Sequence, residues 1–302
     1  MTAKSRLHTC GRSGHLVITG PYNNSEELVG MAKHELVRLE DKFSSYSESS
    51  VISRINQAAG TGSFSPLDAE GRSLFNYAST LWEQSKHLFD PTIRLLQNCY
   101  NEEGELLSTE AQLTDMLSLV GWSHMEVGKE GARLNKKGMV IDLNSCVCAY
   151  AVDSVRKILL KEGVESALIE MDQDVVTIGR QTDGANWLVG VRHPKGSRAA
   201  IARLKVNGMG LTRRGDFERR VLIKDEYFGR GLSPVDGHPI PGLLSVIVVA
   251  ENCLTACSAA SIARLKTEKP AMQWLDGLGM QWMAIDRKLV CHGPLAPRRG
   301  LF

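Results

Sequence analysis

Five polar segments of the chain hold side chains that could do chemistry, at residues 40–56, 89–92, 142–153, 215–219 and 233–239. Asp90 and Thr92 belong to a Phe-Asp-Pro-Thr turn, in which the Asp side chain can bond to nearby backbone N–H groups. Asp142 ends an apolar run ahead of a helical segment, and the N-terminus of a helix attracts anions such as phosphate. A phosphate cradle normally uses glycines, whereas this junction carries Asn144 and Ser145. Each segment alone is typical of an ordinary loop or a capped helix.

Cysteine is the second residue type that could carry chemistry. Cys148 is expected at a helix start, where the thiol pKa falls, and Cys146 lies two residues before it. Cys253 and Cys257 are four residues apart, so they share one face if that segment is helical. These thiols could form a metal or redox site, but a free cysteine commonly packs as a small buried hydrophobe. The sequence has no Cys-x-x-Cys pair, which favours the packing role.

The composition limits the class of protein. The chain has 302 residues, 36 Lys and Arg against 34 Asp and Glu, and 43% hydrophobic residues, which indicates a folded globular protein. Its net charge of +2 lacks the basic excess of a nucleic-acid binder. The longest apolar stretch, residues 243–250, is far shorter than the roughly 20 residues of a membrane helix, and residues 1–20 lack the apolar core of a signal peptide. Seven cysteines, an odd number, fit a reducing compartment. We therefore expect a cytoplasmic protein without nucleic-acid or membrane partners.

Helical patterns come early in the chain and strand-like runs later, which predicts an α+β fold of mixed sheets and packed helices. Asn24 with Glu27 resembles a capping box for a first helix that runs to Phe43, and Ser65 with Pro66 starts a second helix. Further helices are expected at residues 108–120, 148–162, 255–265 and 270–278. Strands are expected at residues 16–19, 140–143, 167–169, 175–178, 187–191, 201–206, 221–224, 244–250 and 283–285. We expect one domain over residues 1–302, with a surface tail at 294–302.

The order of the five polar segments resembles the flavin transferase (ApbE) family, enzymes that move FMN from FAD onto a Ser or Thr of a target protein. The resemblance covers residues 16–285. The family motifs are matched in chain order by Glu40, Phe43, Ser44 and Asn56; Asp90, Pro91 and Thr92; Asp142, Leu143, Tyr150, Ala151, Val152 and Asp153; Trp187, Gly190 and Pro194; Gly215, Asp216, Phe217, Glu218 and Arg219; and Pro234, Gly237 and Pro239.

This resemblance implies a flavin transferase fold with two lobes around a central cleft for a flavin nucleotide. It implies FAD as the bound cofactor and a target protein as the macromolecular partner. Tyr46 could stack on the isoalloxazine ring, and Asp142 or Asp174 could accept hydrogen bonds from N–H groups of the flavin or the adenosine. The residues expected to bind the cofactor are Tyr46, Asp90, Thr92, Asp142, Asp174, Glu218, Arg213 and Arg214.

The sequence departs from the family pattern where the resemblance places the metal. The family's Asp-x-x-x-Thr, which the resemblance would make a pair of magnesium ligands, reads Cys257 and Ser261. Mg²⁺ prefers carboxylate oxygen, whereas thiolate suits softer ions. The sequence therefore predicts an altered metal site at these two positions. The family's Lys is Cys148, a further change at an expected catalytic position.

Arginine occurs at three positions around the expected cleft. Arg213 and Arg214 replace the family's Thr-Ser, and Arg230 replaces its His. Guanidinium groups can grip phosphate with two N–H groups at once. They could replace the charge of the metal, hold a nucleotide without reaction, or lie solvated at the surface.

The sequence is compatible with three functions. One is an active FAD:protein FMN transferase with altered metal use, in which Arg230 and Cys148 are the catalytic candidates. The second is a non-catalytic relative that binds a flavin, another nucleotide or a protein. The third is a different reaction in the same cleft, which uses Cys148 or Cys257.

Overall fold

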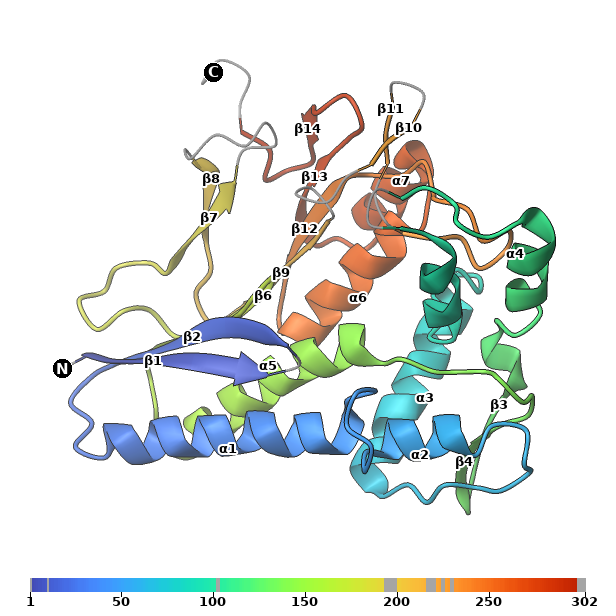
Figure 1. Cartoon of the computed structure of the whole chain (residues 1–302). Coiled ribbons are helices and arrows are strands. Elements are labelled where there is room, and N and C mark those ends of the chain that lie inside the picture. Colours follow the sequence, from blue (N-terminus) through green and yellow to red (C-terminus); the bar gives the residue numbers. More distant parts are fainter. Residues whose placement is uncertain are drawn as a thin grey trace.

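The fold is organised by an eight-stranded sheet in which each strand runs antiparallel to its neighbours (Figure 1). The computed structural model describes residues 2–9, 11–101, 104–192, 200–215, 221–223, 226–228 and 231–297. In their order across the sheet, the strands are β1 (Thr2–Thr9), β2 (Arg12–Thr19), β5 (Ala167–Met171), β6 (Asp174–Ile178), β9 (Gly210–Gly215), β12 (Ser245–Ala250), β13 (Gln281–Ile285) and β14 (Cys291–His292).

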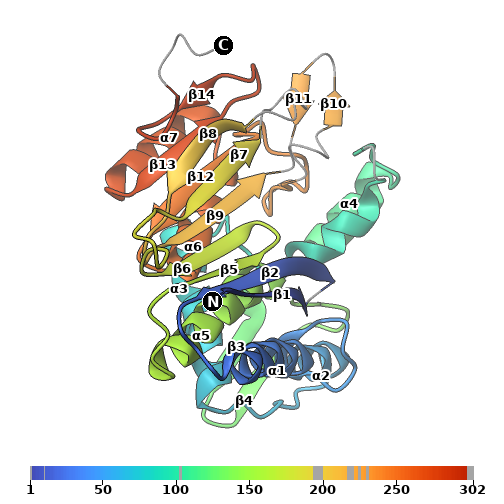
Figure 2. The same ribbon diagram turned by 90° about the vertical axis from the view of Figure 1, so that its left-hand side faces the viewer.

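Helices cover one face of this sheet, and a hairpin covers part of the other (Figures 1 and 2). The α-helices are α1 (Ser25–Phe43), α2 (Val51–Gln57), α3 (Ala69–Gln84), α4 (Glu110–Leu117), α5 (Asn144–Lys161), α6 (Cys253–Arg264) and α7 (Glu268–Gly277). Two 3₁₀ segments are η1 (Ile93–Cys99) and η2 (Trp122–His124). Three separate hairpins pair β3 (Met125–Gly128) with β4 (Gly131–Leu134), β7 (Leu188–Arg192) with β8 (Ala200–Lys205), and β10 (Val221–Ile223) with β11 (Glu226–Phe228).

Strand β12 illustrates how the two faces are covered. Val246, Val248 and Ala250 pack with residues of α6 and α7, whereas Ile247 and Val249 pack with residues of the β7–β8 hairpin. Side chains alternate between the two faces of a strand, so a strand covered on both sides reads as a continuous apolar run. The strand predicted at residues 244–250 is confirmed, because a strand covered on both faces has the continuous apolar sequence seen there.

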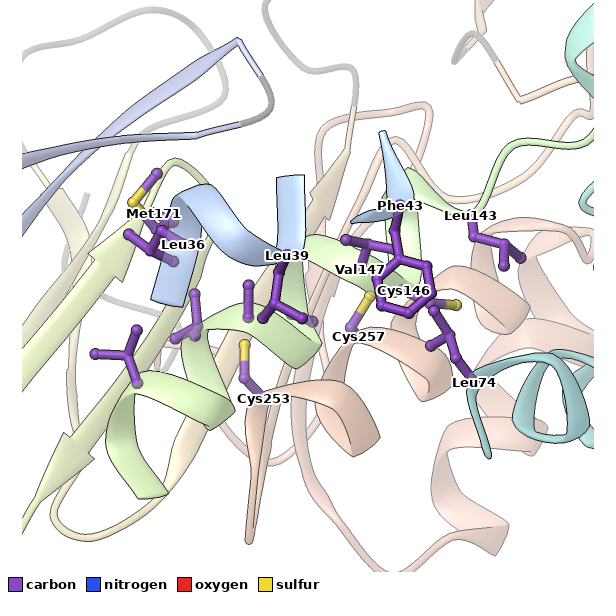
Figure 3. Close-up of a cluster of buried hydrophobic side chains, with 14 of the residues drawn as sticks. Leu36, Leu39, Phe43, Leu74, Leu143, Cys146, Val147, Met171, Cys253 and Cys257 are labelled. Atoms are coloured by element: carbon purple, nitrogen blue, oxygen red, sulfur yellow. The ribbon is translucent and has the colours of Figure 1, made fainter. Parts of the chain in front are cut away.

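The largest apolar cluster lies between the sheet and helices α1, α3, α5 and α6. Figure 3 shows Cys146, Cys253 and Cys257 among its aliphatic and aromatic side chains. The expected first helix is confirmed, and it buries Leu28, Ala32, Leu39 and Phe43 on one face. Helix α5 therefore lies between α1 and the sheet, and its position is fixed from both sides.

Asp153 ties α5 to α6. Its two carboxylate oxygens accept hydrogen bonds from the backbone N–H groups of Cys253 (2.8 Å) and Leu254 (2.7 Å). These are the first two residues of α6, whose N–H groups have no partner within the helix. A side chain of one helix thus satisfies the end of the other.

Several local predictions are wrong, each for a physical reason. Residues 140–143 form no strand, because the side-chain amide of Asn56 bonds to both the N–H and the carbonyl of Ile141 and takes the place of a neighbouring strand. The second helix begins at Ala69 rather than near Pro66, since Asp68 caps it. Asn24 makes no side-chain capping bond to α1.

Other elements lay outside the predictions. The elements that were not expected are helix α2 and strands β1, β3, β4, β9, β11 and β14. Helix α5 begins at Asn144, four residues before the expected start at Cys148, because Asp142 accepts a hydrogen bond from the Asn144 N–H (2.7 Å). Within the described parts of the chain, no helix is long and apolar enough to cross a membrane.

Candidate active site

A cleft of about 350 Å³ opens where the segments around Asp90, the start of α5, the end of α6 and β9 converge. Among the described residues, its charged lining consists of four arginines and two aspartates, namely Arg12, Arg94, Arg214, Arg264, Asp90 and Asp142. Asp172 and Asp174, which lie outside this lining, pair with Arg12 (3.8 Å) and Arg214 (2.8 Å), so the cleft offers guanidinium donors to an anionic ligand rather than a net positive charge. The backbone at the N-terminus of α5 adds a partial positive charge on the same wall, at Asn144 and Ser145.

Asp142 organises the start of α5 and the nearby arginine. One carboxylate oxygen accepts the Asn144 N–H, and the other lies 3.1 Å from Arg94 Nη1. Arg94 also donates to the hydroxyl of Ser45 and stacks on the ring of Tyr46, with 4.6 Å from the guanidinium carbon to the ring centroid. The predicted cofactor residues Tyr46 and Asp142 therefore come together on Arg94. Tyr46 is 74% exposed, so its ring stays accessible.

Asn144 adds an unsatisfied acceptor to this wall. Its Oδ1 atom is buried and has no hydrogen-bond partner within the described structure. Its Nδ2 atom makes only long contacts, at 3.4 Å to Asp142 and 3.5 Å to Ser45. A buried polar atom without a partner is uncommon in folded proteins, and here it lies beside the cleft.

Asp90 and Thr92 hold the turn that precedes η1. Asp90 Oδ1 accepts from the N–H (2.9 Å) and the hydroxyl (2.6 Å) of Thr92, and its Oδ2 accepts from the Trp122 N–H (2.8 Å). The Thr92 hydroxyl in turn accepts from the Gly121 N–H (2.7 Å). Asp90 lines the cleft, whereas Thr92 is fully buried and is not among the described lining residues. Both side chains position the turn that presents Arg94; their contact with a flavin stays a prediction.

Arg214 is held by the buried side chains of two other elements. Its Nη2 atom lies 2.8 Å from Asp174 Oδ2 on β6 and 2.9 Å from Cys257 Sγ on α6. Asp174 Oδ1 accepts from the hydroxyl of Thr212 (2.5 Å), its register partner on β9. Because side chains alternate along a strand, Thr212 and Arg214 project from the same face of β9 toward Asp174. Of the predicted cofactor residues, Arg214 and Asp174 are thus brought together.

Cys257 is a neutral thiol in this surrounding. Burial raises its pKa, although the neighbouring Arg214 cation works in the opposite direction. Its S–H group donates to the carbonyl oxygen of Ser145 (3.1 Å), and its sulfur accepts from Arg214. Burial also disfavours the Arg214 cation, but the Asp174 carboxylate outweighs this effect and raises the guanidinium pKa well above its ordinary value. The ion pair is therefore charged and the thiol is not.

The donors around Cys257 do not fit a magnesium ion. Both oxygens of Asp174 already accept protein hydrogen bonds, and the sulfur faces the Arg214 cation. The oxygens that hydrogen-bond to the sulfur are the Ser145 carbonyl and the Ser261 hydroxyl, at 3.1 and 3.9 Å. Mg²⁺ requires a nearly octahedral shell of oxygens. Throughout the described ranges, no group of three or more His, Cys, Asp or Glu side chains could hold a metal ion.

The structure places the remaining predicted residues as follows. Cys148 is buried in the second turn of α5, away from the helix start, and is not among the described lining residues of the cleft. Ser261 lines the cleft. Arg213 is half-buried on β9, and its N–H donates to the Gln173 carbonyl. Glu218 and Arg230 lie outside the described residues.

Sequence reasoning missed three cleft arginines. Arg94 follows the Asp-Pro-Thr motif by two residues, and Arg264 is three residues beyond Ser261 on α6. Their closeness in sequence to predicted site residues could therefore have indicated both arginines. Arg12 had no such signal, because only sheet pairing brings β2 to the cleft.

Comparisons with a family profile and with individual proteins indicate the same family. The sequence profile of the ApbE family matches residues 14–284. The chain is similar to an FAD:protein FMN transferase of Haemophilus influenzae, with 25% identity over 226 residues, which are 71% of this chain and 65% of that protein. It is also similar to the FAD:protein FMN transferase of Vibrio cholerae, with 22% identity over 245 residues, covering 78% and 72% of the two chains. The chain thus matches somewhat less than two thirds of the H. influenzae protein.

Solved structures confirm the α+β fold. The apo form of the Pseudomonas stutzeri flavinyl transferase ApbE superposes with a TM-score of 0.85 and 23% identity, covering 97% of this chain and 94% of the other. The ApbE protein of Thermotoga maritima superposes with the same score and identity, covering 97% of both chains. At this level of identity the similarity establishes the fold.

Proposed function

The chain belongs to the ApbE family, and on this premise we propose that it binds FAD in the cleft and transfers the FMN group to a hydroxyl group of a target protein. The two relatives named above are FAD:protein FMN transferases, which supports the choice of FAD and of a protein acceptor. In the transfer, the acceptor oxygen forms a bond to the phosphorus of the FMN half. The bond from that phosphorus to the AMP half breaks, AMP leaves, and the hydroxyl proton passes to solvent.

The observation that carries this proposal is the set of guanidinium groups that line the cleft. The diphosphate of FAD is a dianion, and Arg94, Arg214 and Arg264 offer charge-assisted donors to it. In phosphoryl transfer, the protein contributes chiefly by positioning the reactants and by stabilising the charge on the phosphate oxygens. Cations built into the walls of a cleft can do both.

Asn144 supports a ligand with an N–H group close to the diphosphate site. Its buried Oδ1 lacks a partner among the described residues, and an N–H group of the flavin or the adenine would satisfy it. Tyr46, stacked on Arg94 and largely exposed, offers a ring face to the isoalloxazine. Both roles are part of the proposal.

The proposal is tested in two steps with FAD as the probe. Equilibrium dialysis and the visible spectrum of the purified protein measure binding, and we expect one FAD per chain. Incubation with FAD and a panel of candidate acceptor proteins from the same organism then measures transfer, as AMP release and as a gain of one FMN mass on an acceptor. A protein that does not bind FAD in any buffer contradicts the proposal.

A second candidate is an FAD-binding protein without transferase activity. The pairing of Cys257 with Arg214 favours it, because the predicted metal position holds a neutral thiol beside a cation. Stoichiometric FAD binding without AMP release, across all acceptors and with magnesium, manganese or a chelator present, identifies this candidate. Release of AMP in any of these conditions rules it out.

A cytoplasmic location is part of the same proposal. Four buried cysteines, at Cys99, Cys146, Cys253 and Cys257, are free thiols. Free thiols persist in reducing compartments. The third function open on the sequence, a reaction at Cys148 or Cys257, loses support because both thiols are buried.

A further inference from the structure

The guanidinium of Arg214 is a fixed cation in one wall of the cleft. Arg214 lines the cleft, yet its side chain is only 11% exposed because β6 and α6 enclose it. Asp174 holds it from one side at 2.8 Å and the sulfur of Cys257 touches it from the other at 2.9 Å. A guanidinium fixed from two sides keeps its place without a ligand.

The remaining donors of Arg214 are available to a ligand. A guanidinium has five N–H groups. Nη2 uses its two for Asp174 and Cys257, and Nη1 contacts the Arg213 carbonyl at 3.4 Å. Arg214 lines the cleft, and the part of its side chain that stays exposed can meet a ligand there. The side chain can therefore bond to an anion in the cleft while it keeps its contacts to the wall.

We infer that the Arg214 guanidinium takes the place of a divalent cation in this cleft, so that the chain binds the diphosphate of FAD without a metal ion. This inference rests on the proposed function, which makes FAD the ligand. A divalent ion next to Cys257 would lie against the guanidinium and be repelled by it. It would also compete with Arg214 for Asp174, the buried carboxylate at this point.

The first test measures FAD binding by the unmodified protein in EDTA and in excess magnesium. We expect dissociation constants that agree within about twofold. Binding that is about tenfold or more tighter with magnesium overturns the inference and leaves the proposed function standing. Binding in neither buffer overturns the proposed function.

The second test probes the metal directly, without FAD. Free Mn²⁺ gives a six-line electron paramagnetic resonance signal that disappears when the ion binds to a protein. We expect the unmodified chain to leave the signal intact at equimolar Mn²⁺. Stoichiometric loss of the signal overturns the inference, whatever the result with FAD.

Variants then separate the cation from the rest of the cleft. Arg214→Ser is expected to weaken FAD binding in EDTA by at least about tenfold, since a charge-assisted contact to phosphate is lost. In the double variant, Arg214→Ser removes the competing cation and Cys257→Asp adds a second carboxylate beside Asp174. This double variant is expected to bind Mn²⁺. The matched control is Arg203→Ser on β8, an exposed arginine outside the described lining of the cleft. Equal FAD affinity of Arg214→Ser and the control, with both variants folded by circular dichroism, contradicts the role of Arg214.

Discussion

Arg214 and Asp174 form a buried ion pair, with Nη2 and Oδ2 2.8 Å apart and the carboxylate side chain fully enclosed. The pair links adjacent strands of the sheet at the point where β9 faces the cleft. Because a lone charge in such a place is costly, each partner depends on the other.

Asp174→Asn should destabilise the protein by about 3–5 kcal/mol, because it leaves the Arg214 cation buried without its counter-charge. Urea unfolding followed by circular dichroism measures this loss. The double variant Asp174→Asn with Arg214→Met should lose less, since it removes both charges. The control is Asp172→Asn, two residues earlier in an exposed turn, and it should stay within about 0.5 kcal/mol of the parent. Equal losses for Asp174→Asn and Asp172→Asn would refute the dependence.

Arg94→Ala should weaken FAD binding about tenfold or more, because it removes a cleft cation and the support of Tyr46. Isothermal titration calorimetry gives the affinity. Arg133→Ala is a close match as a control, since Arg133 also stacks on a ring, that of Phe64, and bonds to a carboxylate, that of Glu126, but lies on β4. Unchanged FAD affinity in Arg94→Ala would remove Arg94 from the proposed site.

Cys291 should be the fastest-labelled of the described cysteines, since the other five are buried. Partial burial and the neighbouring Asp286 raise its pKa, so its thiolate is scarce at pH 7 and labelling should accelerate as the pH rises through 9. Labelling with a maleimide and peptide mass mapping gives the rate for each cysteine. In 8 M urea all sites should react alike. Rapid labelling of Cys148 or Cys257 in the folded protein would revive a thiol-based reaction.

Glu70→Gln should lower the free energy of unfolding by about 1–2 kcal/mol at pH 7. This range takes into account that solvent partly screens the ion pairs of the Glu70 carboxylate. Hydrogen bonds from Arg38, and further ones from Lys42 and Tyr150, lower the pKa of Glu70 from 4.5 to about 2 despite partial burial. The folded state favours the carboxylate, so the stabilisation is present above pH 4.5 and fades as the pH falls toward 2.

Urea unfolding at pH 7 and at pH 3 checks this prediction. The difference between the parent and Glu70→Gln should shrink at pH 3. Glu83→Gln, an exposed position on the same helix α3, should change stability little at either pH. A difference that grows at pH 3 would contradict the sign.

The fold was predictable from the sequence where local pattern and burial coincide. The run at residues 244–250 predicts β12 because both of its faces are covered. Strand β9 was missed because its sequence, Gly-Leu-Thr-Arg-Arg-Gly, places a charged residue in the interior. Only the carboxylate of Asp174, 40 residues earlier in the chain, makes that burial possible. Such distant compensation leaves no local signal.

The site was predictable in part for the same reason. Motif order indicated Asp90, Asp142 and Asp174, and the structure groups Asp90 and Asp142 on the cleft while Asp174 holds Arg214 from behind. The pattern could not show that Cys148 lies inside the second turn of α5, because the helix begins four residues earlier, at Asn144, whose N–H bonds to Asp142. Nor could it show that Cys257 faces an arginine.

The bond from Asp153 to the first amides of α6 has a consequence for the time course of binding. It fastens α6, which carries Ser261, to α5, which carries Ser145, so we expect these two walls to move together. A ligand then meets a shape that already exists, and its arrival need not wait for the helices to rearrange. Stopped-flow traces with FAD in excess would follow a single exponential whose rate rises linearly with the FAD concentration.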